Sequence, residues 1–321
     1  MKANYHPPSI ENWIGRTSGN ADYLHENIRL LNLSETVNAI SSEAQAAILG
    51  YACDTGVLRN LGRPGAREGP MALRSALGKL PFPDNGLRQL WDAGDVECIL
   101  DDLESAQNKF SSAIENLLTR GLLPIAIGGG HDIAYAHYMG IRNYLKGSKS
   151  LGIINFDAHL DLRQPNPVGH SGSPFFQIAD DCRRQQTPFR YACIGLREDA
   201  NPRELWQRAN ALGVLQVMRS KLLPKYHETS LDKLASFVDG VDVVYVTMDM
   251  DGFSSAIAPG VSAASPMGFY PEDIMPFLDL ILQSKKLISV DLAELNPKYD
   301  QDNQTALLAA ALIHKILREV F

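Results

Sequence analysis

The pattern of apolar positions predicts a series of buried strands. Short runs rich in Val, Ile and aromatic residues end in Gly or Asp, and they lie at residues 46–52, 88–94, 122–129, 150–157, 189–196, 213–218, 241–249 and 285–292. Apolar residues at helical spacing lie between many of these runs and predict helices at residues 102–121, 131–145, 202–213, 271–285 and 304–321.

Strands that are apolar on both faces and alternate with helices indicate βαβ units and a mostly parallel sheet. Neither an internal repeat nor a long Ser/Gly/Pro linker divides the chain. We therefore expect an α/β fold, a single three-layer α-β-α domain over residues 1–321 with residues 1–45 as a peripheral N-terminal segment. Residues 58–70, which include Gly62, Pro64, Gly65 and Gly69, are predicted to form a long loop rather than a strand or helix.

Charge and composition exclude several classes of protein. The chain has 321 residues, of which 30 are Lys or Arg and 37 are Asp or Glu, so its formal net charge is −7. Nucleic-acid binding is not expected, because phosphate contacts need clustered basic residues. No apolar run reaches the roughly 18 residues of a membrane span, and the N-terminus lacks the apolar core of a secretory signal. Four cysteines without a framework spacing indicate reduced thiols and a cytoplasmic protein.

Residues 154–163 (INFDAHLDLR) carry the strongest chemical signal. An apolar strand leads into Asp157, His159 and Asp161, which follow one another at every second position. In an extended chain these three side chains project to one side. Carboxylates and an imidazole on one side form a ligand set for a divalent metal ion, whereas an acidic turn after a strand is the simpler explanation.

Three other predicted strand ends carry related residues. Asp249 and Asp251 follow the run 241–249, His131 follows three glycines after the run 122–129, and Asp291 and Glu294 lie near the end of the run 285–292. Each has a simple structural explanation when it is taken alone, such as a solvated strand end or a hydrogen bond at a helix start. In parallel α/β sheets, however, ligands bind outside the carboxyl ends of the strands, so we expect these residues to converge on one crevice.

The converging set consists of four carboxylates and two imidazoles, from His131, Asp157, His159, Asp161, Asp249 and Asp251. It has too many ligands for one tetrahedral zinc ion and suits two divalent ions, whose charge of +4 balances the −4 of the carboxylates. Because most of the ligand atoms are carboxylate oxygens, Mn²⁺ is favoured over Zn²⁺.

Six sequence blocks resemble those of the ureohydrolases, the arginase and agmatinase family. They are GGGHD (128–132), FDAHLDLR (156–163), MDMDGFSSAIAPGVSAASP (248–266), GRPGAREGPMALR (62–74), WDAGD (91–95) and DLAELNP (291–297). The resemblance implies an arginase-like fold, a homo-oligomer and a centre of two manganese ions. It also implies that Asp157, Asp161 and Asp249 bridge the ions, that His131 binds one of them, and that His159 and Asp251 bind the other.

Departures from the usual family blocks indicate one branch of the family. Gly130 stands where an Asp is usual, Phe253-Ser254-Ser255 replaces Leu-Asp-Pro, and Ser171-Gly172-Ser173-Pro174 replaces a His-Gly block before Pro. Together with Arg163 and the segment WIGR (13–16), these blocks resemble the branch that hydrolyses N-formimidoyl-L-glutamate to L-glutamate and formamide in histidine degradation.

The expected chemistry is metal-assisted hydrolysis of an amidine C–N bond, in which two ions lower the pKa of a bridging water. By the resemblance, Glu294 holds the amidine group, and we expect Asp161 to relay a proton to the departing amine. Arg163 and Ser171 are the candidates for binding an anionic substrate, because a guanidinium suits a carboxylate, although Arg163 could instead neutralise a ligand carboxylate. His170 is an additional candidate acid.

Two other functions stay open at this stage. Another ureohydrolase, acting on a guanidino acid such as guanidinobutyrate or resembling agmatinase, would share the same metal ligands. A metal-binding regulatory paralogue without turnover is the alternative outside enzymes, although all six candidate ligands are present.

Overall fold

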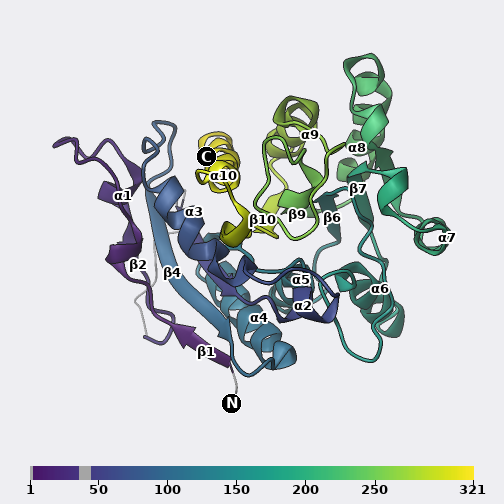
Figure 1. The fold of residues 1–321 in the computed structure, drawn as a ribbon, viewed down its shortest axis with the longest axis horizontal. Helices are drawn as coiled ribbons and strands as arrows, with labels where there is room; N and C mark the ends of the chain where they lie inside the picture. Colours follow the sequence, from purple (N-terminus) through teal and green to yellow (C-terminus); the bar gives the residue numbers. More distant parts are fainter. Residues whose placement is uncertain (1–2, 36–44) are drawn as a thin grey trace.

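The computed structural model describes residues 3–35 and 45–321, and these residues form a 10-stranded sheet with helices on both faces (Figure 1). The strands are β1 (Ala3–His6), β2 (Arg29–Leu30), β3 (Gln45–Ala52), β4 (Gln89–Cys98), β5 (Leu123–Ile127), β6 (Leu151–Phe156), β7 (Tyr191–Leu196), β8 (Leu215–Met218), β9 (Val243–Asp249) and β10 (Leu287–Ala293). All eight predicted strands are present, with bounds that differ by a few residues.

The strands follow the order β1-β4-β3-β5-β10-β9-β6-β7-β8, with β2 also paired to β4. Every pair is parallel except β1 with β4, so the expected mostly parallel sheet is confirmed. The short strands β1 and β2 were not predicted, and both lie in the N-terminal segment that we expected to be peripheral. Residues 1–2 and 36–44 of that segment lie outside the described residues.

The helices are α1 (Leu24–Asn27), α2 (Thr55–Arg59), α3 (Gly69–Leu77), α4 (Leu103–Thr119), α5 (Ile133–Leu145), α6 (Pro174–Arg184), α7 (Arg203–Ala211), α8 (His227–Asp239), α9 (Pro271–Gln283) and α10 (Gln304–Val320). The five predicted helices correspond to α4, α5, α7, α9 and α10. The predicted loop over residues 58–70 is wrong at both ends, because α2 extends to Arg59 and α3 begins at Gly69. Pro70 is compatible with a helix there, since the first turn needs no N–H from it.

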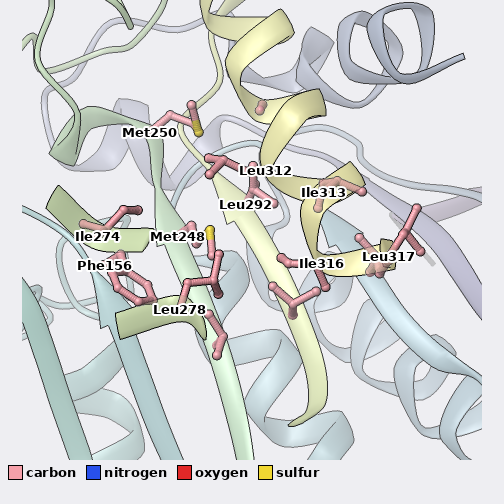
Figure 2. Packing of buried hydrophobic residues seen from close by; sticks show 14 of the residues in the cluster. Phe156, Met248, Met250, Ile274, Leu278, Leu292, Leu312, Ile313, Ile316 and Leu317 are labelled. Carbon is pink, nitrogen blue, oxygen red and sulfur yellow. The ribbon is translucent and has the colours of Figure 1, made fainter. Parts of the chain in front are cut away.

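Two hydrophobic clusters place the helices in two layers. Buried residues of α3, α8, α9 and α10 pack on one face of the sheet, and those of α4, α5, α6 and α7 pack on the other. Figure 2 shows Leu278 of α9 and Ile316 of α10 against Met248 of β9 and Leu292 of β10. The central strands are therefore covered on both faces, which holds their carboxyl ends in fixed positions. None of the helices in the described ranges is long and apolar enough to cross a membrane.

Candidate metal centre

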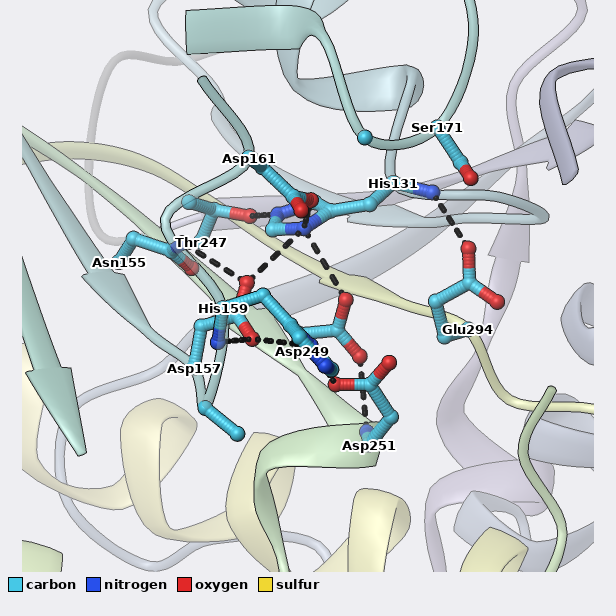
Figure 3. Close-up of polar contacts among 12 residues, drawn as sticks. His131, Asn155, Asp157, His159, Asp161, Ser171, Thr247, Asp249, Asp251 and Glu294 are labelled. Carbon is cyan, nitrogen blue, oxygen red and sulfur yellow. Dashed lines mark hydrogen bonds and ion pairs between the residues drawn. The ribbon is translucent and has the colours of Figure 1, made fainter. Parts of the chain in front are cut away.

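Four neighbouring strands deliver the predicted site residues to one edge of the sheet (Figure 3). His131 follows β5 after the turn of three glycines, Asp157 follows β6, Asp249 ends β9 and Glu294 follows β10. These strands are adjacent in the order β5-β10-β9-β6. The parallel arrangement therefore brings together residues that are far apart in the sequence.

All six predicted metal ligands lie in two overlapping groups. The candidate ligand atoms of the first group lie within 4.8 Å of one another, and they belong to His131, Asp157, Asp161 and Asp249. The same limit holds for the second group, which consists of Asp157, His159 and Asp251. We call these residues the carboxylate–histidine cluster. Asp157 belongs to both groups, so its two carboxylate oxygens could serve two neighbouring cations.

The surroundings of His131 suit a cation. Its Nδ1 lies 2.9 Å from an oxygen of Asp161, 3.0 Å from Asp249 and 3.4 Å from Asp157. One ring nitrogen offers at most one hydrogen, which cannot satisfy three carboxylates at once. A divalent ion among these atoms can satisfy them together, so the donor set fits such an ion.

The second group has comparable geometry. His159 Nδ1 lies 3.2 Å from Asp251 Oδ1 and 3.3 Å from Asp157 Oδ1. Backbone donors orient the carboxylates, since His159 N–H donates to Asp157 Oδ1 at 2.7 Å and Asp251 N–H donates to Asp249 Oδ1 at 2.8 Å. The carboxylates are thus held in place by the chain segments that carry them.

The segment after β6 is not the extended strand that we expected. The strand ends at Phe156, and Asp161 has a φ of +46°. Side chains nevertheless alternate along this segment, because Ala158, Leu160 and Leu162 are buried in the core while the residues between them face the cluster or the cavity beside it. Glu294 also has a positive φ, of +64°. Left-handed backbone at residues other than Gly is uncommon and occurs often at functional sites.

Burial and mutual repulsion perturb the acidic side chains. Burial, and then the charges of Asp251 and Asp157, raise the pKa of Asp249 well above its usual value. Burial raises the pKa of Asp251 to about 6, although His159 opposes the shift. Burial and the nearby Asp249 raise the pKa of Glu294 well above the ordinary range. The cluster therefore needs protons or cations to balance its negative charge.

The pKa values of the histidines and of Asp157 shift in the direction that favours their charged forms. Burial opposes the charged form of His131, yet Asp249 and the bonded carboxylates raise its pKa well above the usual value. Burial also opposes the charged form of His159, but its pKa is raised well above the usual value, chiefly by the charge of Asp251. Burial also opposes the charge of Asp157, but hydrogen bonds from both histidines lower its pKa. Each histidine thus occupies a position that favours positive charge.

A chain of fully buried polar side chains leads from His131 into the core. His131 Nε2 lies 3.0 Å from Thr247 Oγ1, and Thr247 donates to Asp291 at 2.6 Å. The hydroxyl of Thr247 has one hydrogen, and Asp291 takes it, so Thr247 must accept from His131 Nε2–H. The Nδ1 lone pair of His131 is then free to face the cluster. Thr247 is not among the site residues predicted from the sequence.

Asp291 is held in turn by two other buried residues. His137 Nδ1 lies 2.6 Å from Asp291, and the hydroxyl of Tyr245 donates to the same carboxylate. His137 Nε2 lies 2.6 Å from Ser289 Oγ, which donates to Pro124 O at 3.0 Å. His137 thus contacts Asp291 through one ring nitrogen and Ser289 through the other.

Glu294 has one carboxylate oxygen free for a ligand. Oε1 accepts the backbone N–H of His131 at 3.0 Å, whereas Oε2 is buried and makes no hydrogen bond within the described residues. Glu294 lines a cavity of about 310 Å³ together with His131, His159, Asp161, Asp249 and Asp251. A buried oxygen without a partner costs stability, and an N–H donor from a ligand would satisfy it.

The proposed substrate-binding residues Arg163 and Ser171 line the same cavity. Ser171 is buried and its Oγ accepts from Asn60 Nδ2 at 3.2 Å. Arg163 is exposed and makes no ion pair with any described residue. His170 lines a neighbouring hollow instead, where its Nδ1 accepts the N–H of Gly172 at 3.2 Å and burial lowers its pKa. The acid role that we considered for His170 stays a prediction.

Asn155 is a second residue that sequence reasoning missed. Its Nδ2 donates to Asp157 Oδ2 at 3.0 Å, and the residue is fully buried. Asn155 and Thr247 each precede a cluster aspartate by two positions within an otherwise apolar strand. A polar residue in phase with a candidate ligand is the signal that could have identified both.

Gly130 marks a local difference from the usual family block. A Cβ atom there would lie 2.6 Å from Asp132 Oδ1 and 2.7 Å from Val57 Cγ2. Asp132 is fully buried, accepts from the hydroxyl of Tyr51 at 2.9 Å, and has its pKa raised to about 7, mainly by burial. The loop therefore has room for the acidic group at position 132 and none for a side chain at position 130.

The fold and the cluster define an α/β protein with a buried carboxylate–histidine site at the carboxyl end of a parallel sheet. Comparison with known proteins identifies its family: a model of the Arginase family matches residues 44–318. The chain is 37% identical to the formimidoylglutamase of Clostridium tetani over 98% of its length and 96% of that protein. It is 42% identical to the formimidoylglutamase of Aeromonas hydrophila over 85% of its length and 86% of that protein.

Solved structures agree with this assignment. Trypanosoma cruzi formiminoglutamase with Mn²⁺ has a TM-score of 0.74 and 25% identity, covering 86% of this chain and 93% of that one. The formimidoylglutamase of Bacillus subtilis has a TM-score of 0.82 and 20% identity, covering 95% of this chain and 94% of that one, and so supports the fold. The chain belongs to the arginase family, and the arginase-like fold expected from the sequence is confirmed.

Proposed function

We propose that this protein is a hydrolase that converts N-formimidoyl-L-glutamate and water to L-glutamate and formamide. The main support is the likeness to formimidoylglutamases, at 37% and 42% identity over most of each chain. The cluster of buried carboxylates and histidines, beside a cavity that holds a free glutamate oxygen, supports it further. The substrate is an amidine that carries two carboxylates.

The residues of the first group, His131, Asp157, Asp161 and Asp249, would hold one divalent ion. Asp157, His159 and Asp251 would hold a second. We propose Mn²⁺ for both positions, because the ligand atoms are mostly carboxylate oxygens and a related formiminoglutamase was solved with Mn²⁺. Bound ions of this kind lower the pKa of a water and so supply a nucleophile near neutral pH.

Glu294 positions the reacting group of the substrate in this proposal. Its free Oε2 accepts an N–H of the amidinium, and the opposite charges strengthen that bond. Because Oε1 is fixed by the backbone N–H of His131, the carboxylate cannot rotate away from the cluster. The carbon under attack is thereby held against the cluster side of the cavity.

The departing amine of glutamate needs a proton. Asp161 is the proposed relay, because it belongs to the cluster, lines the cavity and keeps 13% of its side chain exposed. It accepts a proton when water adds to the amidine carbon and returns it to the amine nitrogen as the C–N bond breaks. Formamide and L-glutamate are then the products.

Product analysis tests the proposed function. Purified protein with added Mn²⁺ is offered N-formimidoyl-L-glutamate, arginine, agmatine and 4-guanidinobutyrate, and formamide, urea and glutamate are quantified. We expect formamide and glutamate from the first substrate and little urea from the others. Urea from 4-guanidinobutyrate at the higher kcat/KM would favour the guanidino-acid alternative, and no product from any substrate would favour the regulatory paralogue.

A further inference from the structure

A second arginine lines the cavity that Arg163 enters. Arg63 lies on the loop between α2 and α3, and it borders the same cavity as Glu294 and Ser171. Within the described residues, neither Arg63 nor Arg163 makes an ion pair. We infer that Arg63 binds one carboxylate of the dianionic substrate while Arg163 binds the other, an inference that rests on the proposed function.

Arg63 is held rigidly from one side. Its backbone N–H donates to Ser262 Oγ at 2.8 Å, its Nε donates to Ser262 O at 2.9 Å, and its Nη2 donates to Val261 O at 2.7 Å. The guanidinium carbon also lies 3.9 Å from the centre of the Tyr299 ring. These contacts fix the plane of the guanidinium before any substrate arrives, which lowers the entropy lost on binding.

The same contacts leave the outer end of the guanidinium free. A guanidinium has five N–H groups, and the two carbonyl contacts of Arg63 occupy one on Nε and one on Nη2. Both hydrogens of Nη1 and the second hydrogen of Nη2 remain. These form the fork that binds a carboxylate through two parallel hydrogen bonds.

The balance of charge in the cavity indicates that both arginines bind anionic groups of the substrate. Two divalent ions would balance the four aspartates of the cluster, and the amidinium of the substrate would balance Glu294. The other residues that line the cavity are uncharged: Val57, Asn60, Leu61, Gly62, Ser171, Ala200, Asn201, Leu205, Ser262 and Ala263. Arg63 and Arg163 then contribute +2, which equals the charge of two carboxylates with opposite sign.

If Arg63 had a purely structural role, replacing it would have a different effect on the kinetics. Through Ser262 and Val261, it joins the loop after α2 to the loop after β9. Loss of such a link would disturb the cavity for every substrate alike. A carboxylate contact, in contrast, affects only the substrates that carry that carboxylate, so substrates that lack one carboxylate separate the two roles.

The experiment compares R63Q and R163Q with the wild type on three substrates. These are N-formimidoyl-L-glutamate, N-formimidoyl-L-glutamine, whose distal group is neutral, and 4-formimidoylaminobutanoate, which lacks the α-carboxylate. We expect the wild type to prefer the dianion over both monoanions. R63Q should lose about ten- to a hundredfold of one preference, mostly through KM, and R163Q should lose the other.

Two further variants act as controls. R67Q removes the same charge four positions along the loop, where Arg67 contacts Glu97 at 2.7 Å and does not line the cavity, so its kinetics should match the wild type. S262A removes the hydroxyl that accepts the backbone N–H of Arg63 and leaves the charge unchanged. It should change kcat/KM by the same factor for all three substrates.

The outcomes separate this inference from the proposed function. If R63Q lowers kcat/KM by the same factor for all three substrates, as S262A is expected to do, the carboxylate role of Arg63 is wrong while the proposed function stands. If the wild type releases formamide from none of the substrates, both are wrong. If R63Q loses one of the two substrate preferences and keeps the other, the assignment is supported. The preference that is lost identifies which carboxylate Arg63 binds.

Discussion

Thr247 connects the carboxylate–histidine cluster to the buried, hydrogen-bonded pair of His137 and Asp291. Its single hydrogen goes to Asp291, so its oxygen accepts the proton of His131 Nε2. The hydroxyl therefore decides which nitrogen of His131 is available to a metal ion. Replacing a group that orients a metal-binding histidine in this way typically lowers metal affinity or activity about ten- to a hundredfold.

Replacing Thr247 should weaken metal binding. T247V keeps the shape of the side chain but removes the oxygen, and we expect Mn²⁺ affinity to fall about ten- to a hundredfold. T247S keeps the hydroxyl and should stay close to the wild type. Isothermal titration calorimetry on metal-stripped protein measures both, with circular dichroism as the control for folding. Equal affinity for T247V and the wild type would contradict the role of the hydroxyl.

Arg163 carries the second residue-scale prediction. R163A should lose a charge-assisted contact of about 1.5–3 kcal/mol, which is roughly ten- to a hundredfold in kcat/KM. Because the contact involves a group that does not react, most of the loss should be in KM, and bound metal should not change. R163K should restore little, since an ammonium lacks the fork. Depleted metal with an unchanged KM would instead show that Arg163 neutralises the cluster.

At the level of elements, α3 is joined to β4 by a fully buried arginine. Arg74 is 0% exposed, and it donates to Asp92 at 2.9 Å, to Asp95 at 2.7 Å and to the backbone oxygen of Gly94 at 2.9 Å. Trp13 of the N-terminal segment donates to the other oxygen of Asp92 at 2.7 Å. This network ties the N-terminal segment, at Trp13, to the sheet.

Breaking that network should destabilise the protein strongly. R74A leaves the buried carboxylate of Asp92 without its cation, and we expect a loss of about 3–5 kcal/mol in the free energy of unfolding. R67A removes an arginine from an exposed pair with Glu97, and should cost less than about 1 kcal/mol. Urea unfolding measures both variants. A loss in R74A no larger than in R67A would show that the network contributes little.

The elements that sequence reasoning missed have few buried residues or begin at turn-like sequences. In α8 only Ser230, Leu234 and Val238 are buried, too sparse a pattern to predict a helix. The helix α6 begins at Pro174, directly after a Ser-Gly-Ser block that is typical of a turn. Strand β1 has four residues and, among the residues that the structure describes, pairs with β4 alone, so it needs little hydrophobic sequence. Strands β5 and β9, in contrast, are buried at every position, which requires continuous apolar runs and made them predictable.

At the scale of the molecule, the parallel sheet explains why the carboxylate–histidine cluster was predictable and the position of Arg63 was not. Residues at the carboxyl ends of neighbouring strands must meet, so His131, Asp157 and Asp249 could be grouped from the sequence. The loop that carries Arg63 is placed by its contacts with Ser262 and Val261, and no local pattern encodes these contacts. The single domain and the homo-oligomer stay predictions.

The electrostatics of the cluster predict how metal and pH act together on stability. Burial raises the pKa of Asp251 to about 6, and burial also raises the pKa of Glu294. A carboxyl group with a raised pKa stabilises the fold below its unfolded pKa, and this contribution is lost as the pH rises through the folded value. Through Asp251, metal-stripped protein should therefore lose stability as the pH rises from about 3.9, the unfolded pKa of an Asp, to about 6. Bound ions replace the protons that the cluster loses in this range.

Thermal unfolding with and without Mn²⁺, from about pH 5 to pH 8, measures this linkage. We expect the increase in Tm caused by Mn²⁺ to grow with pH. D251N removes one titrating group and should flatten the dependence. An increase in Tm that stays constant across the range would mean that protons and metal do not compete for the cluster.

The central claim is that the cluster holds two ions that hydrolysis requires. The most direct measurement titrates metal-stripped protein with Mn²⁺ and follows bound metal per chain together with formamide release from N-formimidoyl-L-glutamate. We expect formamide release to reach its maximum as bound metal approaches two ions per chain, and D249N, while still folded, to lose metal and nearly all turnover. Full turnover without bound metal, or a D249N protein that keeps two ions and a normal kcat, would contradict it.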